Sequence, residues 1–178
     1  QRQMCIRDRT GIMPAEMTET DFQHVIDCHA KAALRVRQAG FDAVQIHAAH
    51  GYLLSQFLTP YYNRRTDRYG GTLHNRARLI YEVVAAVRRA VGEDYPVMIK
   101  LNFDDFMSEG EGLTFPESLA MFEHLDMLGV DFIEPSGTNL SSGNGITQSF
   151  PRIARSIEKQ SYFKEQVSDC LLYTSDAA

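Results

Sequence analysis

The chain has 178 residues, of which 44% are hydrophobic and 23% charged, and its net charge is −5 at pH 7. This composition is typical of a globular protein with one domain, or part of a larger one, and excludes a disordered chain. The acidic balance excludes a basic nucleic-acid-binding surface, and no apolar run approaches the roughly 20 residues that span a bilayer. Cys5, Cys28 and Cys170 are too widely spaced for a disulfide framework or zinc site, which favours a cytoplasmic protein.

The two ends of the chain differ in character from the rest. Residues 1–9 and 167–178 do not continue the periodicity of their neighbours, and both resemble translated sequencing-adapter read-through at the ends of gene fragments. Ordinary frayed termini are the alternative interpretation. We therefore expect non-native tails at 1–9 and 167–178, a partial domain at 10–166, and a gene truncated at both ends. An unbroken native reading frame through these segments on resequencing would contradict this expectation.

Helical and strand patterns alternate along the middle of the chain. Apolar residues at three- and four-residue spacing predict helices over residues 18–39, 80–91 and 116–128. Thr18 and Asp21 can form a capping box at the start of the first helix, and Pro116 suits the first turn of the third. Short β-branched runs predict strands over residues 41–47, 96–101 and 130–134, and the glycine-rich segment 63–75 predicts a loop.

This αβαβαβ order indicates a parallel sheet with right-handed crossovers. The segments that begin at Gly40 and Gly129 resemble each other, which suggests two βα repeats of about 45 residues each. We therefore predict an α/β fold that forms part of a (β/α)₈ TIM barrel. A Rossmann sheet is the alternative, but no Gly-x-Gly-x-x-Gly motif follows any predicted strand.

Polar side chains follow the predicted strands, at the ends where a barrel carries its functional groups. His47, His50 and Tyr52 follow the first strand, and Lys100 ends the second. Two imidazoles and a phenol within six residues can bind a carbonyl, ligate a metal or relay a proton. A metal site lacks a visible third ligand, because Cys28 falls on a predicted helix, so we predict none. For each histidine alone, a satisfied core or surface residue is the alternative. Further polar groups at strand ends are Asn102, Glu134 and Ser136.

Two longer blocks carry a family resemblance. The stretches His47–Leu58 (HAAHGYLLSQFL) and Asn63–Arg76 (NRRTDRYGGTLHNR) resemble the old yellow enzyme family of FMN-dependent NAD(P)H:flavin oxidoreductases. The resemblance covers roughly residues 13–166. It implies an FMN-binding TIM barrel to which this chain contributes about strands 4 to 6, and it implies that the loops holding the FMN phosphate lie outside this chain.

The resemblance also implies an activity and roles for individual residues. The reaction is reduction of activated C=C bonds, with hydride from reduced FMN and with NADH or NADPH as the reductant. His47 and His50 bind the substrate oxygen, Tyr52 supplies the proton, and Lys100 lies near N1 and O2 of the flavin. The alternatives are a Tyr52 that only packs against the flavin or barrel wall, and a Lys100 that reaches the barrel mouth or forms a lyase Schiff base.

Other interpretations of the whole chain stay open. One is a dienoyl-CoA reductase-like enzyme with iron–sulfur and dinucleotide domains, which His50 argues against mildly because that subgroup tends to lack the second histidine. Another is a non-functional gene fragment, since three strands cannot close a barrel, and we expect this piece alone to retain no FMN. The expected partner is a small electrophilic substrate, with neither nucleic acid nor membrane, and the full-length protein is expected to form a homo-oligomer.

Overall fold

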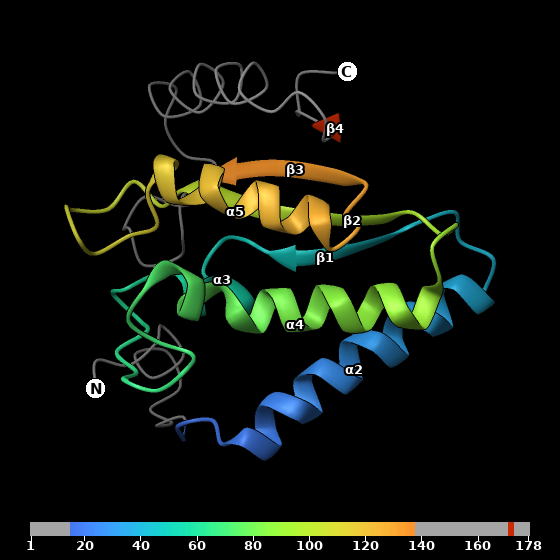
Figure 1. Cartoon of the computed structure of the whole chain (residues 1–178), viewed down its shortest axis with the longest axis horizontal. Coiled ribbons are helices and arrows are strands. Elements are labelled where there is room, and N and C mark those ends of the chain that lie inside the picture. Colours follow the sequence, from blue (N-terminus) through green and yellow to red (C-terminus); the bar gives the residue numbers. More distant parts are fainter. Residues whose placement is uncertain (1–14, 138–170, 173–178) are drawn as a thin grey trace.

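The computed structural model describes residues 15–137 and 171–172, in which helices and strands alternate along the chain (Figure 1). The elements are α2 (Glu19–Gln38), β1 (Val44–Ala48), α3 (Leu53–Leu58), α4 (Leu73–Val91), β2 (Val97–Asp104), α5 (Phe115–Met127), β3 (Phe132–Gly137) and β4 (Leu171–Leu172). None of these helices has the length and apolar composition of a membrane-spanning segment. The predicted tails lie outside the described residues, apart from 171–172, and stay predictions.

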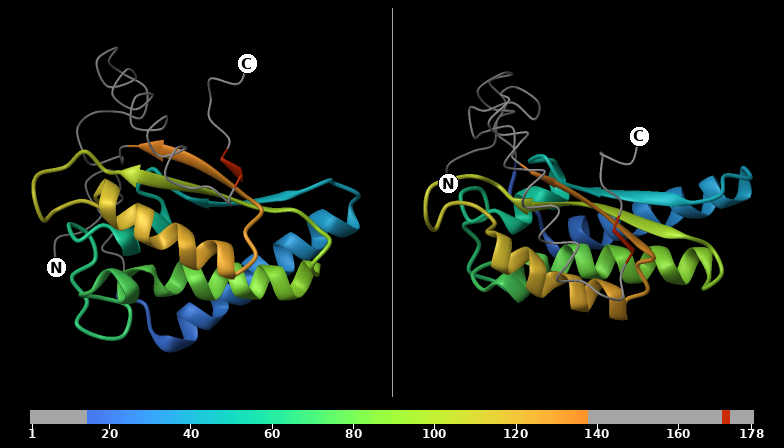
Figure 2. Two further views of the ribbon diagram at one scale, coloured as in Figure 1. Left: turned by 45° about the horizontal axis from the view of Figure 1, so that its top comes forward. Right: turned by 90° about the horizontal axis from the view of Figure 1, so that it is seen from above.

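The strands form one parallel sheet in the order β1-β2-β3-β4, as the αβαβαβ order predicted. Helices α2, α4 and α5 lie on one face of this sheet (Figure 2). The strands alternate accordingly: Val97, Ile99, Leu101 and Phe103 of β2 are each 0% exposed and belong to the core under the helices. We call the opposite face, which no described helix covers, the open face.

Local signals in the sequence start and stop the helices. The Thr18 side chain caps α2 and Asp21 bonds back to it, which confirms the predicted capping box. Thr114 and Glu117 form a second capping box on α5, where Pro116 occupies the first turn and removes no helical hydrogen bond. Gly40 follows α2 with a φ of 85°, a conformation that costs other residues roughly 1 kcal/mol or more.

The internal repeat has a structural counterpart. Gly40 precedes β1 and Gly129 precedes β3, with φ angles of 85° and 79°. Gln45 and Glu134, which occupy matching positions in the two strands, are separated by 89 residues in sequence, and Gln45 Nε2 donates to Glu134 Oε2 at 2.8 Å on the open face. The repeat therefore places equivalent side chains on the same face of the sheet.

Several predicted boundaries are wrong. β1 begins at Val44 rather than residue 41, because the chain first closes a turn after α2 and leaves Phe41 64% exposed. Helix α4 begins at Leu73, inside the predicted loop, because Thr72 caps it. β2 continues to Asp104 although Asn and Asp disfavour strands, since β3 pairs with it as far as that residue. The short helix α3 gave no periodic signal that could separate it from an apolar run.

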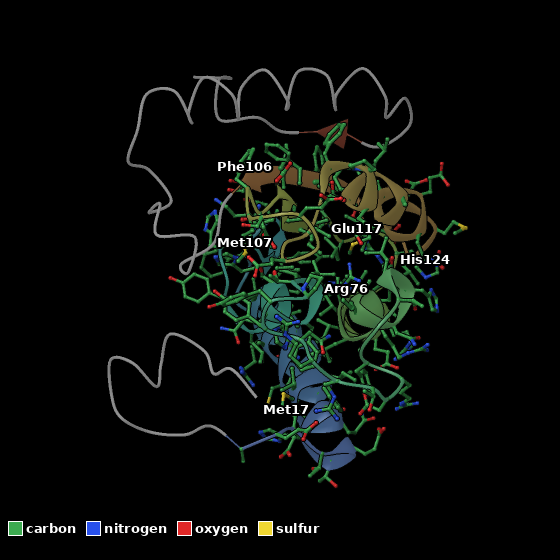
Figure 3. The ribbon with its side chains drawn as sticks, turned by 90° about the vertical axis from the view of Figure 1, so that its left-hand side faces the viewer. Met17, Arg76, Phe106, Met107, Glu117 and His124 are labelled. Carbon is green, nitrogen blue, oxygen red and sulfur yellow. The ribbon has the colours of Figure 1, made fainter. Side chains whose placement is uncertain are left out.

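A buried arginine ties α3, α4 and α5 together. Arg76, with 8% of its side chain exposed, donates to the carbonyl oxygens of Leu58 at 2.7 Å and Gly71 at 2.9 Å. It also pairs with Glu117 of α5 at 2.5 Å (Figure 3). The guanidinium thereby satisfies backbone groups at both ends of the loop that follows α3, and it holds that loop against α4 and α5.

We expect Arg76→Met in the full-length protein to lower the free energy of unfolding by about 3 kcal/mol, because it leaves a carboxylate and two carbonyls without their donor. Urea denaturation measures this loss. Arg89→Met is the matched control on the same helix, since Arg89 is exposed, and its effect should stay within about 0.5 kcal/mol. Equal losses for the two variants would contradict the assigned role.

Candidate active site at the carboxyl ends of the strands

The turn after β1 brings three predicted site residues together. His50 and Gly51 both have positive φ angles, 63° and 77°, so the chain reverses sharply before α3. The His47 ring lies 5.3 Å from the His50 ring and 5.0 Å from the Tyr52 ring, centroid to centroid. Tyr52 is the N-terminal cap position of α3 and is 50% exposed. Two imidazoles and a phenol thus line one patch at the end of β1.

His50 is anchored to both neighbouring strands. Its backbone N–H donates to Asn102 Oδ1 of β2 at 3.1 Å, and its Nε2 lies 2.5 Å from Ser136 Oγ of β3. The residue is only 8% exposed. A left-handed conformation at a non-glycine residue costs roughly 1–3 kcal/mol and persists only where the surroundings hold it. The bonds to β2 and β3 supply that hold.

His47 presents a free donor. The Ala49 N–H donates to His47 Nδ1 at 3.2 Å, so in the neutral ring the proton resides on Nε2. Among residues 15–137, no group forms a hydrogen bond with that Nε2. An exposed Nε2–H at the edge of the sheet can therefore bind an incoming oxygen atom.

Both histidines are neutral at physiological pH. Burial lowers the pKa of His50 to about 4, helped by the positive charge of Lys100 and by His47, against the opposing charge of Glu134. Burial, followed by Lys100, also lowers the pKa of His47, with Glu134 again opposing. Neutral imidazoles can donate one hydrogen bond without bringing a full charge into the site.

Lys100 lies beside this pair, within a row of register partners on the open face. His47 pairs with Lys100 across β1 and β2, and Lys100 pairs with Glu134 across β2 and β3. Lys100 Nζ lies 2.7 Å from Glu134 Oε1. Although burial alone would raise it, the pKa of Glu134 is lowered by the hydrogen bonds from Lys100 and Gln45. Glu134 is therefore ionised, and Lys100 and Gln45 each have further N–H donors that these two bonds do not use.

Sequence reasoning gave no role to three residues that support the site. Asn102 and Ser136 hold His50 in place. In the sequence, only their positions at the ends of predicted strands pointed to the site. Asp105 lies behind Asn102 and is 0% exposed. Its sequence position did not indicate a role, because a loop aspartate is ordinarily exposed.

The loop after β2, with Phe106 and Met107, reaches the same end of the molecule (Figure 3). Cys28 lies on α2, and no group of three possible metal ligands occurs within the described part of the chain.

The fold and site define an α/β protein with functional groups gathered where parallel strands end. The model of the NADH:flavin oxidoreductase / NADH oxidase family matches residues 2–175, so the chain belongs to this family of oxidoreductases. This confirms the old yellow enzyme resemblance predicted from the two sequence blocks.

Curated relatives and solved structures agree with this family. The chain is 45% identical to a metal reductase of Desulforamulus reducens over 72% of the chain and 19% of that protein. It is 39% identical to an NADPH dehydrogenase of Bacillus cytotoxicus over 70% of the chain and 35% of that protein. The chain thus spans about a fifth to a third of these relatives.

Two solved structures show the corresponding fold. A 2-naphthoyl-CoA reductase complex matches with a TM-score of 0.81 and 29% identity, covering 90% of this chain and 24% of that one. Morphinone reductase with tetrahydroNAD matches with a TM-score of 0.62 and 27% identity, covering 90% and 47%.

The electrostatic coupling of His50 to Lys100 is testable by imidazole NMR. In the full-length protein we expect His50 to titrate near its low pKa of about 4. Since the unfolded chain binds this proton near pH 6.5, stability should fall as the pH drops from about 6.5 toward 4. Lys100→Gln should raise the His50 pKa, because it removes a nearby cation and frees Glu134. Lys31→Gln, at an exposed position on α2, is the control and should leave it unchanged.

Proposed function

We propose that the full-length protein is an FMN-dependent oxidoreductase that uses NADH or NADPH to reduce activated C=C bonds, and that this chain supplies about strands 4 to 6 of its TIM barrel. A parallel sheet whose described helices all lie on one face supports this placement, because a TIM barrel has its helices outside and the other face of its strands inside. The main support for this proposal is the neutral pair of His47 and His50 beside Lys100.

The residues on the open face fit a flavin ring. A flavin offers carbonyl oxygens and ring nitrogens along one edge, and its reduced form is anionic there. Lys100 has three N–H donors and gives one to Glu134, while Gln45 has two and gives one to the same carboxylate. The remaining donors can hold the pyrimidine edge of FMN. Reduced FMN, when bound, supplies the hydride.

The two histidines would stabilise the charge that develops on the substrate. As hydride reaches the β carbon, negative charge grows on the carbonyl or nitro oxygen, where aimed donors lower the barrier. His47 offers Nε2–H directly. At His50, the Ser136 hydroxyl is the hydrogen-bond partner of Nε2 in this structure, and a substrate oxygen would replace that hydroxyl. Rings 5.3 Å apart can direct one N–H each at a single oxygen.

Tyr52 would deliver the proton to the α carbon. Its ring packs against His47 at 5.0 Å, and half of the residue is exposed. A phenol keeps its proton at neutral pH yet can give it to a strongly basic carbanion. We assign its hydroxyl to the substrate side of the histidines, because Tyr52 stands at the start of α3, beyond the turn at His50.

A dienoyl-CoA reductase-like flavin and iron–sulfur enzyme is the second candidate. The match to 2-naphthoyl-CoA reductase, and the small share of the metal reductase that this chain covers, favour it. Iron and acid-labile sulfide assays on the full-length protein distinguish the two, and both candidates require flavin absorbance bands.

We propose that the protein acts in the cytoplasm on a small electrophile and forms a homo-oligomer.

His47→Ala in the full-length flavoprotein should weaken binding of 4-chlorophenol, whose phenolate oxygen mimics the enolate, by about tenfold to a hundredfold. Alkene reduction should slow similarly, whereas flavin reduction by NAD(P)H should change little. His24→Ala on α2 is the control. Unchanged chlorophenol affinity in His47→Ala would refute the role given to this residue.

Tyr52→Phe should keep chlorophenol affinity and flavin reduction close to wild type. It should slow the oxidative half-reaction by about 10²-fold or more, because general acid catalysis contributes on that scale. Stopped-flow measurement of flavin reoxidation by an enone gives the rate. A Tyr52→Phe variant that reoxidises at the wild-type rate would show that the proton comes from elsewhere.

A further inference from the structure

A buried acid lies behind the histidines, directly after β2. Asp105 is 0% exposed, and its Oδ2 accepts hydrogen bonds from Thr59 Oγ1 at 2.6 Å and from the Leu113 N–H at 2.9 Å. Its Oδ1 accepts one from Asn102 Nδ2 at 2.7 Å. Burial raises the pKa of Asp105, and these three hydrogen bonds oppose the rise. A buried carboxylate with three donors is an internal anchor.

Asn102 connects this acid to the candidate active site. The Asn102 amide turns its NH₂ end toward Asp105, where Nδ2 donates to Oδ1. The amide oxygen then faces the other way, where it accepts the backbone N–H of His50 at 3.1 Å. That bond lies within the turn where His50 has a φ of 63°. The acid thereby determines which end of the amide meets the strained turn.

We propose that Asp105 is a positioning residue that sets the orientation of the Asn102 amide and so holds His50 in the turn that presents its imidazole to the substrate. This inference rests on the substrate-binding role proposed for His50. The other oxygen of Asp105 is held by Thr59, after α3, and by Leu113, in the loop after β2. The geometry of His50 is therefore set from outside the strand that carries it.

Exchanging the side chains at positions 102 and 105 tests this relay, by which we mean the hydrogen bonds that connect Asp105 through Asn102 to His50. In Asp105→Asn, the new amide oxygen can still accept from Thr59 and Leu113, but its NH₂ faces the NH₂ of Asn102. Two donors cannot bond, so Asn102 flips and turns its NH₂ toward the His50 N–H. The double variant Asp105→Asn with Asn102→Asp reverses donor and acceptor, because the new carboxylate at position 102 accepts from both the new amide and His50.

Two measurements on the full-length flavoprotein are diagnostic: hydrogen exchange at the His50 amide and the Kd of 4-chlorophenol. Asp105→Asn should speed exchange and weaken chlorophenol binding, each by about tenfold. The double variant should return both to within about twofold of wild type. Ser118→Ala is the control for a purely structural role. It removes a buried hydrogen bond from the Ser118 hydroxyl to the Phe103 carbonyl, and should lower Tm while leaving both readouts unchanged.

Wild-type exchange and affinity in Asp105→Asn, or a double variant as impaired as the single one, would overturn the inference. Should Asp105→Asn fail to fold, the double variant carries the test by itself, because it has the same amide at position 105: wild-type affinity supports the relay and lost affinity overturns it. A wild-type protein that binds no chlorophenol would overturn the proposed function, whereas exchange at the His50 amide would still test whether Asp105 positions His50.

Discussion

The parallel register of β1, β2 and β3 is the constraint on which the site depends. It aligns His47 with Lys100 and Lys100 with Glu134, so three polar side chains share one row of the open face. Side chains alternate between faces, so a slip of one residue would move Ile46, Ile99 and Ile133 to that face and bury the polar row under the helices. The apolar face packed against α4 thus secures the position of the chemistry.

The same arrangement sets the charge state of the site. Burial, followed by the charge of Lys100, keeps both imidazoles neutral. Glu134 offsets part of the lysine's charge and accepts a hydrogen bond from Gln45. Neutral donors beside a paired cation suit a reaction in which negative charge appears only in the transition state, because the ground state then contains no unpaired buried charge. The hydrogen bonds behind His50 add geometric precision to this electrostatic setting.

Much of the fold followed from local signals, and the site followed from the family motif. The capping box at Thr18, the glycine after α2 and the β-branched runs act over a few residues, so sequence alone located their elements. The bond between His50 and Ser136 joins residues 86 apart, and the one from Asn102 to Asp105 needs a buried loop acid. Such contacts depend on tertiary packing, which periodicity does not encode. The extension of β2 to Asp104 likewise depends on its partner strand.

We propose that His47 and His50 together bind the oxygen of an activated substrate. A crystal structure of the full-length flavoprotein with 4-chlorophenol would show whether they do. We expect the phenol oxygen within about 3.2 Å of His47 Nε2 and of one His50 ring nitrogen; if that nitrogen is Nε2, Ser136 should no longer contact it. A chlorophenol bound with its oxygen away from both imidazoles, or bound outside the end of β1, would contradict it.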